Sequence, residues 1–226
     1  MPTATDVPAF TRELEVFRTH RLMAVLRSRS TEDALWGSRL LVEAGFRIFD
    51  ITFGTPDAPT VIRTLRDEFP DCLVGAGTVL TVEDARAAQE AGAQFLAAPS
   101  LNRALIDYGS EHHILVIPGV ATPTEMAQAM GFGARLLKFF PAEPLGGAAF
   151  VKAVLGPFPD FPIVATGAID DESIGDYLKA GALAVGIGGD LLPAKAMAER
   201  NAEKILKRAR KYLHSLQPEA CHGHHG

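Results

Sequence analysis

The chain has 226 residues, of which 47% are hydrophobic and 22% charged, a composition typical of globular proteins that bury a core without disulfides or a structural metal. Its formal net charge of -5 argues against a surface for nucleic acid or anionic membranes, because both select basic patches. A small anionic ligand is not excluded, since a few local donors are enough to hold it.

The start of the chain and its cysteines indicate the compartment. The first 20 residues carry acidic side chains and no long apolar region, so they do not resemble a signal peptide. No stretch approaches the roughly 20 apolar residues of a membrane span. The two cysteines, Cys72 and Cys221, do not form a disulfide framework. We therefore expect a cytoplasmic protein with no membrane or nucleic-acid partner.

Short apolar runs recur along the chain, and each is followed by a turn and then a helical pattern. Such runs are typical of strands buried in a parallel sheet, and their intervals suit strand–helix units. The predicted strands are 22–27, 47–52, 72–77, 94–99, 113–119, 135–140, 162–167 and 183–189.

Capping signals mark several of the helices between these strands. Ser30 opens one helix and Gly45 is placed to end it, while Thr81 is placed to cap a second. Pro123 has the position of a first helical turn in a third. The expected helices with such signals are 30–45, 81–92, 122–133 and 170–181, with a leading helix at 8–19 and a terminal one at 196–215.

The alternation of strands and helices predicts an α/β fold, either a closed barrel or an open doubly wound sheet. Eight units without a composition break favour a (β/α)8 TIM barrel with an N-terminal helix. We expect one domain over residues 1–215, with the leading and terminal helices packed outside the barrel. Residues 216–226 have no periodicity, and we expect a disordered tail there.

In such a barrel, the carboxyl ends of the strands face the active site. An arginine, a carboxylate, a lysine and several hydroxyls therefore converge on one mouth, and glycine turns after the last two strands offer N–H groups to a phosphate. The residues at these ends are Arg27, Asp50, Thr52, Thr78, Pro99, Lys138, Thr166, Gly167, Gly188 and Gly189.

Lys138 is the sharpest of these features, because it lies inside the apolar run LLKFFPAE at 136–143. An apolar site disfavours the charged ammonium, and a neutral amine can attack a carbonyl to form a Schiff base. The alternative is a lysine that extends to the barrel mouth or pairs with a carboxylate. The local pattern leaves both interpretations open.

Two further charged residues also have two interpretations. Asp50, in FRIFDITFG, is either a general acid/base or the ion-pair partner of Lys138 or a cap. Arg27 is able to bind a carboxylate with two hydrogen bonds, but arginines at strand ends also form structural pairs. The stretch GAGT at 75–78 is either a ligand-binding turn or a tight turn with a cap.

No metal or other cofactor is assigned. His112 and His113 are expected to start a strand and so to point to opposite faces, which prevents chelation of one metal. The tail CHGHHG at 221–226 lies outside the barrel, and the short glycine motif at 186–189 has little specificity alone.

In this order, the residues resemble the 2-keto-3-deoxy-6-phosphogluconate (KDPG) aldolases and their phosphogalactonate (KDPGal) and 4-hydroxy-2-oxoglutarate relatives. The resemblance covers about residues 20 to 195. The matching stretches are AVLR, DITFGTPDA, VGAGTVL, AAPS, IPGVATPTE, LLKFFPAE, GPFP, TGAI and VGIGGDLL.

The resemblance implies a class I, metal-free aldolase, a lyase that forms homotrimers and acts on a small keto acid. Lys138 then corresponds to the Schiff-base lysine and Asp50 to the acid/base carboxylate. The remaining site residues implied for substrate binding are Arg27, Thr78, Pro99, Phe140 and Thr166, with Gly167, Ala168, Gly188 and Gly189 in the phosphate loops.

Four positions depart from the family pattern. Asp50 replaces the usual glutamate, and Gly54 replaces an arginine that binds the pyruvate carboxylate in several members, a role we expect Arg27 to take. Asp190 stands where some members have serine, and a carboxylate facing inward there would repel phosphate. Ala168, in place of glycine, narrows the same loop.

The leading hypothesis is cleavage of a 2-keto-3-deoxy-6-phospho sugar acid to pyruvate and glyceraldehyde 3-phosphate. The alternatives are a KDPGal or 4-hydroxy-2-oxoglutarate aldolase, or a barrel that binds phosphorylated ligands with weakened catalysis because of Asp50. A phosphate-binding isomerase or decarboxylase ranks last, since the strand ends supply no second carboxylate or lysine near Asp50.

Overall fold

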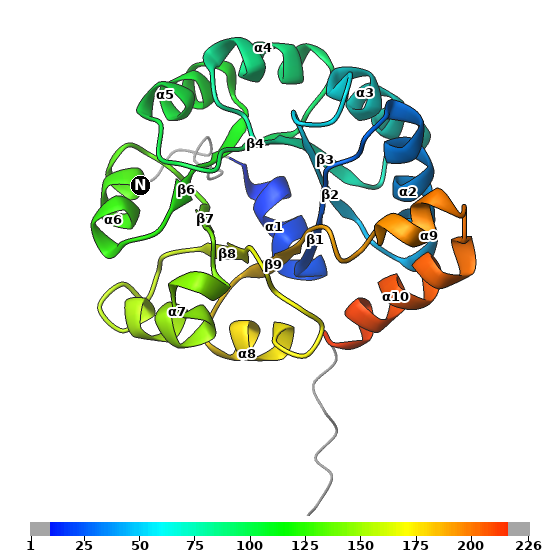
Figure 1. The fold of residues 1–226 in the computed structure, drawn as a ribbon. Coiled ribbons are helices and arrows are strands. Elements are labelled where there is room, and N and C mark those ends of the chain that lie inside the picture. Colours follow the sequence, from blue (N-terminus) through cyan, green and yellow to red (C-terminus); the bar gives the residue numbers. More distant parts are fainter. Residues whose placement is uncertain (1–9, 217–226) are drawn as a thin grey trace, which may run out of the picture.

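The computed structural model describes residues 10–216, which form a ring of parallel strands surrounded by helices (Figure 1). The strands are β1 Leu22–Leu26, β2 Ile48–Thr52, β3 Leu73–Gly77, β4 Phe95–Ala97, β5 Leu115–Ile117, β6 Gly119–Val120, β7 Leu137–Phe139, β8 Ile163–Thr166 and β9 Ala184–Ile187. The helices are α1 Thr11–His20, α2 Thr31–Ala44, α3 Ala58–Glu68, α4 Val82–Glu90, α5 Arg103–His112, α6 Pro123–Gly131, η1 Glu143–Leu145, α7 Gly147–Leu155, α8 Ile174–Lys179, α9 Ala194–Ala198 and α10 Ala202–His214.

The sheet runs in the order β5-β4-β3-β2-β1-β9-β8-β7-β6, and its two edge segments are neighbours in the chain. Only Pro118 separates β5, which pairs with β4, from β6, which pairs with β7. A proline has no N–H for the ladder, but the Pro118 carbonyl still accepts a hydrogen bond from the Lys138 N–H at 2.9 Å. The two segments therefore act as one strand, and the expected eight-stranded α/β barrel is confirmed.

The helix boundaries follow the capping signals in the sequence. The Ser30 hydroxyl accepts a hydrogen bond from the Asp33 N–H at the start of α2, and Gly45 ends that helix with φ 120°. Thr81 and Thr122 each form a capping box with the acidic residue three positions later. Helix α8 begins later than the expected 170, because Asp170 and Ser173 hydrogen-bond to each other in a turn of their own.

Helix α1 does not join the outer ring with the other helices, so the expectation that it packs outside the barrel was wrong. It lies across the centre of the ring in Figure 1, and Phe17 is fully buried against the barrel interior. The Phe17 and Phe95 rings meet edge to face at 5.5 Å. Helix α1 therefore closes the amino-terminal end of the barrel, while α10 packs outside it against α2.

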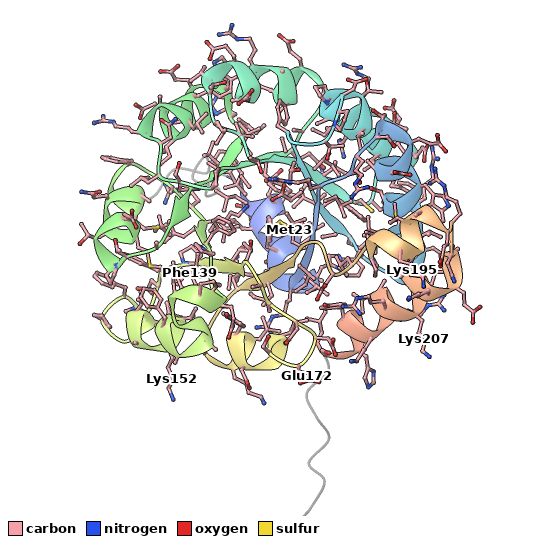
Figure 2. The ribbon with its side chains drawn as sticks, in the orientation of Figure 1. Met23, Phe139, Lys152, Glu172, Lys195 and Lys207 are labelled. Atoms are coloured by element: carbon pink, nitrogen blue, oxygen red, sulfur yellow. The ribbon has the colours of Figure 1, made fainter. Side chains whose placement is uncertain are left out.

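The barrel interior has an apolar floor above α1. Figure 2 shows Met23 at the centre of the ring, while Lys152, Lys195 and Lys207 extend from its rim. This floor fills the amino-terminal half of the barrel and leaves only the carboxyl ends of the strands open for polar groups. The floor forms one apolar cluster with Phe17 of α1, and its buried members are Met23, Ile48, Leu73, Phe95, Ala97, Leu115, Ile117, Leu136, Val164 and Ala184.

Some expectations are corrected and others fall outside the described residues. His112 ends α5 and His113 follows it with φ 53°, so neither starts a strand as expected. The tail at 217–226 and Cys221 lie outside the described residues, and the domain assignment 1–215 stays a prediction. Within residues 10–216, no helix is long and apolar enough to cross a membrane.

Candidate active site

A polar layer lies directly above the apolar floor. Side chains two residues apart on a strand point to the same face, so Asp50 follows Ile48, Lys138 follows Leu136 and Thr166 follows Val164 on the inner face of the barrel. All three polar side chains are buried. The sequence thus changes from apolar to polar at one level of the barrel, near the carboxyl ends of the strands.

Lys138 and Asp50 face each other across this layer. The Lys138 Nζ atom lies 3.6 Å from Asp50 Oδ2, with side-chain exposures of 7% and 0%. The separation is that of a close ion pair, longer than an ordinary hydrogen bond. The pairing that the sequence left as an alternative is therefore present, and the same geometry places an amine and a carboxylate together in a site shielded from water.

Burial raises the pKa of the Asp50 carboxyl above its usual value, because removal from water disfavours the charged form. The positive charges of Lys138 and Arg27 act in the opposite direction and only partly offset it. Within residues 10–216, neither carboxylate oxygen has a hydrogen-bond partner. Such a carboxyl is suited to exchange protons with a ligand, since the protonated and ionised forms are brought closer in free energy.

Gly77 makes room for the Asp50 side chain. A Cβ atom at position 77 would lie 1.6 Å from Asp50 Oδ1 and 2.4 Å from its Cγ. Any larger residue in this part of GAGT would therefore displace the carboxylate from its place beside Lys138. Sequence reasoning noted GAGT only as a turn, and nothing in the sequence indicated the contact across β2 and β3.

Arg27 follows β1 and lies beside Gly54, which follows β2. A Cβ atom on Gly54 would lie 3.4 Å from the Arg27 Nε and 3.7 Å from the Thr52 Oγ1. The guanidinium group therefore fills the space into which a side chain at position 54 would extend. Thr52 is buried, and its hydroxyl has no hydrogen-bond partner within the described part of the chain, so it is available to a ligand next to Arg27.

Three further predicted site residues border the mouth in different ways. The Phe140 ring centroid lies 5.6 Å from Lys138 Nζ, so this ring forms one wall beside the amine. Thr78 has φ 55°, an uncommon conformation for a β-branched residue, at the end of β3. The backbone of Pro99 packs against Gly119, since a Cβ atom on Gly119 would lie 2.2 Å from the Pro99 carbonyl carbon.

The two glycine loops follow the neighbouring strands β8 and β9, so the structure brings them side by side at the mouth. Gly167 and Ala168 both have positive φ, 111° and 58°, which is uncommon for alanine. Among the described residues, the N–H groups of Ala168 and Gly189 donate none of the loop hydrogen bonds. The loops therefore expose backbone donors of the kind that bind phosphate.

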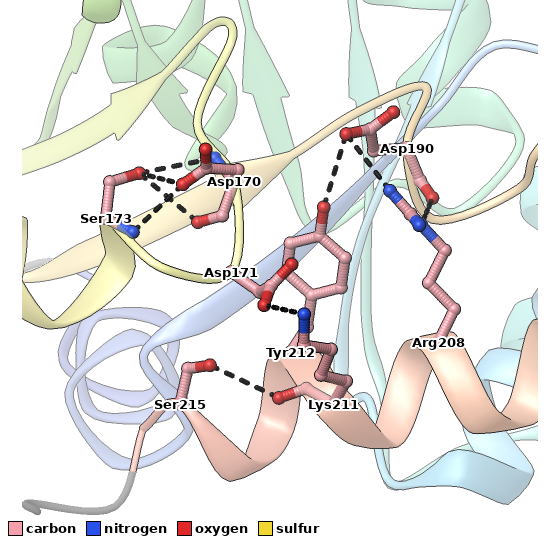
Figure 3. Close-up of polar contacts among 8 residues, drawn as sticks. All are labelled: Asp170, Asp171, Ser173, Asp190, Arg208, Lys211, Tyr212 and Ser215. Atoms are coloured by element: carbon pink, nitrogen blue, oxygen red, sulfur yellow. Dashed lines mark hydrogen bonds and ion pairs between the residues drawn. The ribbon is translucent and has the colours of Figure 1, made fainter.

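Asp190, at the end of the second loop, does not face the barrel mouth. Its carboxylate lies 3.2 Å from the Arg208 guanidinium and accepts a hydrogen bond from the Tyr212 hydroxyl at 3.5 Å, both on α10 (Figure 3). Sequence reasoning missed Arg208 and Tyr212, because no local signal relates a terminal helix to a loop near residue 190.

The site combines a buried amine, a carboxyl with a raised pKa, a guanidinium group close enough to that carboxyl to affect its pKa, and backbone donors after β8 and β9, the strands next to β7 in the sheet. Such a set is able to bind and polarise a carbonyl compound that carries a carboxylate at one end and an anion at the other. Within residues 10–216, no three His, Cys, Asp or Glu side chains are grouped so as to hold a metal ion.

The raised pKa of Asp50 predicts a pH dependence of stability. The folded state keeps this proton at pH values where the unfolded chain has lost it, so the stabilisation is present at low pH and is lost as the pH rises above about 4. As the pH rises from about 3.5 to 7, we expect the free energy of unfolding to fall less in Asp50→Asn than in the native chain. Urea unfolding at each pH measures this free energy. The exposed Asp67→Asn is the control, and equal slopes for Asp50→Asn and the native chain would contradict the prediction.

Known proteins are similar to this chain over most of its length. The family described as "KDPG and KHG aldolase" matches residues 14–208. A 2-dehydro-3-deoxy-phosphogluconate aldolase of Treponema pallidum is 36% identical over 191 residues, 84% of this chain and 91% of that protein. The KHG/KDPG aldolase of Escherichia coli is 34% identical over 195 residues, 86% and 92% of the two chains.

Among solved structures, the KDPG aldolase of Legionella pneumophila with pyruvate captured as a covalent carbinolamine matches with a TM-score of 0.81 and 33% identity. The match covers 87% of this chain and 96% of that one. Similarity of this extent, in fold and along the sequence, includes every strand of the barrel. The chain belongs to the KDPG and KHG aldolase family.

Proposed function

We propose that this protein is a class I aldolase that cleaves a 2-keto-3-deoxy-6-phospho sugar acid to pyruvate and glyceraldehyde 3-phosphate. The observation that carries the proposal is the Lys138 amine, buried in the barrel mouth 3.6 Å from the Asp50 carboxylate. The Legionella relative with a covalent carbinolamine of pyruvate supports a Schiff-base route in this family.

In the proposed reaction, the neutral Lys138 amine attacks the C2 carbonyl, and one amine proton moves to the carbonyl oxygen. The protonated Asp50 carboxyl supplies a second proton, so that this oxygen leaves as water and an iminium ion forms. Asp50 then takes the proton of the C4 hydroxyl, and the electrons of the C3–C4 bond move to the iminium as the aldehyde leaves. Asp50 returns this proton to C3 of the enamine. Hydrolysis of the resulting iminium releases pyruvate, restores the amine and returns a proton to the Asp50 carboxylate.

The remaining residues position the two ends of the substrate. Arg27 is the proposed partner of the pyruvate carboxylate, since its guanidinium lies beside Gly54 and close enough to Asp50 to affect its pKa. Thr78, Thr166, Pro99 and the Phe140 ring enclose the three-carbon unit. Gly167, Ala168, Gly188 and Gly189 are proposed to bind the phosphate through backbone N–H groups.

Related substrates remain as alternatives within the same mechanism. The KDPGal epimer differs only at C4, and 4-hydroxy-2-oxoglutarate lacks the phosphate, so a few loop contacts decide between them. The free donors of the two glycine loops favour a phosphorylated substrate. Retro-aldol kcat/KM values on both epimers and on 4-hydroxy-2-oxoglutarate would rank the three.

The Schiff base has a direct test. Borohydride reduction in the presence of pyruvate is expected to add a pyruvyl group to Lys138, because hydride reduces the iminium to a stable secondary amine. Mass spectrometry of peptides would locate the adduct. Lys138→Arg, which keeps the charge but cannot form the iminium, is the matched control. The absence of an adduct on Lys138 in the native protein would rule out the mechanism.

The second candidate function is a phospho-ligand-binding barrel with weakened catalysis, favoured by Asp50 in place of the family's glutamate. Under the aldolase proposal, Asp50→Asn lowers the retro-aldol rate by about 10²- to 10⁴-fold, and Asp50→Glu does not exceed the native rate by more than about tenfold. Stopped or coupled assays of pyruvate release measure both. A much larger gain with Asp50→Glu, or no activity in either form, would instead favour the binding role.

We further propose that the protein forms a homotrimer and is located in the cytoplasm. The exposed apolar side chains Leu80 and Phe132 support a subunit interface, and the two are linked through neighbouring residues Asn102 and Arg103. Sedimentation equilibrium is expected to give about three times the 24.2 kDa chain mass. Leu80→Glu should lower that mass and the peripheral Lys152→Glu should not, whereas a monomeric native protein would contradict the trimer.

A further inference from the structure

The two glycine loops at the mouth carry acidic side chains as well as backbone donors. Asp170 and Asp171 follow Gly167 and Ala168 in the first loop, and Asp190 follows Gly189 in the second. A phosphate bound by these loops is an anion, so uncompensated carboxylates nearby would oppose its binding. The structure therefore poses the question of where these three negative charges are neutralised.

Asp190 is held by α10 through two contacts with one residue. The Arg208 Nε donates a hydrogen bond to the Asp190 backbone carbonyl, and the same guanidinium lies 3.2 Å from Asp190 Oδ2. The two contacts fix both the backbone and the side chain of the last loop residue. Figure 3 shows the carboxylate turned toward Arg208 and Tyr212 of α10.

Asp171 is held by the same face of α10. Its Oδ2 lies 2.6 Å from the Lys211 Nζ, and this hydrogen bond raises the pKa of the lysine. Asp170 is used within its own loop, where its carboxylate accepts hydrogen bonds from the Ser173 N–H and hydroxyl, which lower its pKa. Two of the three carboxylates, Asp190 and Asp171, are therefore paired with cations of α10, whereas Asp170 keeps its negative charge and is hydrogen-bonded within its own loop.

Arg208, Lys211 and Tyr212 are three and four residues apart, so they lie on one face of α10. The helix is anchored below them by Ile205 and Ala209, which are buried in the protein. Helix α10 thus contacts both glycine loops, although the two loops follow different strands.

We propose that Arg208 and Lys211 are positioning residues for the phosphate end of the substrate, which neutralise Asp190 and Asp171 and hold the two glycine loops in one arrangement. This inference rests on the proposed binding of phosphate by those loops. It goes beyond that proposal because neither residue touches the substrate, and because it gives α10 a part in substrate specificity.

A purely structural role predicts different behaviour. Exposed ion pairs contribute little to stability, and their loss affects all substrates alike. Charge neutralisation predicts instead that loss of Arg208 weakens only phosphate binding, and that removing the charge of Asp190 reverses the defect.

The test compares Arg208→Met, Asp190→Asn and the double variant in steady-state kinetics. For the phosphorylated substrate, Arg208→Met is expected to raise KM about three- to fivefold with kcat nearly unchanged, and the double variant to return KM close to the native value. KM for 4-hydroxy-2-oxoglutarate, which has no phosphate, should not change. Lys211→Met should give a smaller effect of the same kind.

The matched control is Arg39→Met, which removes an ion pair of similar exposure between α2 and α3, 2.6 Å from Glu68. It should leave KM for both substrates unchanged. Thermal unfolding of each variant shows whether it remains folded. Equal KM changes for both substrates, no change in Arg208→Met, or no recovery in the double variant would each overturn the inference.

Calorimetric titration with inorganic phosphate separates this inference from the proposed function, because it requires no turnover. The native protein and the double variant are expected to bind phosphate with similar affinity and Arg208→Met about three- to fivefold more weakly. If the native protein lacks aldolase activity but shows this pattern, the aldolase proposal fails and the role of Arg208 stands. Equal phosphate affinity in all variants, or no phosphate binding by the native protein, overturns the inference.

Discussion

The close pair formed by Lys138 and Asp50 is the interaction on which the candidate site depends. Two opposite charges that are nearly inaccessible to water are costly unless each compensates the other, yet the Asp50 oxygens lie 3.6 Å or more from the amine and have no hydrogen-bond partner within residues 10–216. Burial therefore raises the pKa of Asp50 instead of locking it in the ionised form. The surrounding barrel holds the pair, because the missing side chain of Gly77 on β3 leaves the space that the Asp50 carboxylate occupies.

The barrel supplies this environment by separating its two ends. Helix α1 closes the amino-terminal end with Phe17, and an apolar floor fills the interior up to the level of Ile48 and Leu136. On β2, β7 and β8 the next inward residues are the polar Asp50, Lys138 and Thr166, which lie toward the open, carboxyl-terminal end of the barrel. The position of Lys138 directly above this floor thus determines where in the barrel the candidate site lies.

The ends of β8 and β9, which come next to β7 in the sheet, present a different electrostatic problem. There, the backbone of Gly167 and Ala168 offers donors to an anion, while the nearby Asp171 and Asp190 would repel one. Helix α10 lies outside the ring and carries the compensating charges on Lys211 and Arg208. Asp190 therefore has a partner on a distant element, which explains how an acidic residue is accommodated beside a proposed phosphate site.

Much of this protein was determined by its sequence alone. The alternation of apolar runs with capped helices predicted every strand and the closed barrel, because hydrophobic periodicity and caps act over a few residues. The order of residues at the strand ends predicted the family and named Lys138 and Asp50. Only the tertiary structure decided which contacts they make: the fit of Asp50 over Gly77, the position of Arg27 beside Gly54, the plug formed by α1, and the contact of α10 with both loops. These contacts join residues far apart in the chain, and their geometry depends on strand register and barrel closure, which no local pattern encodes.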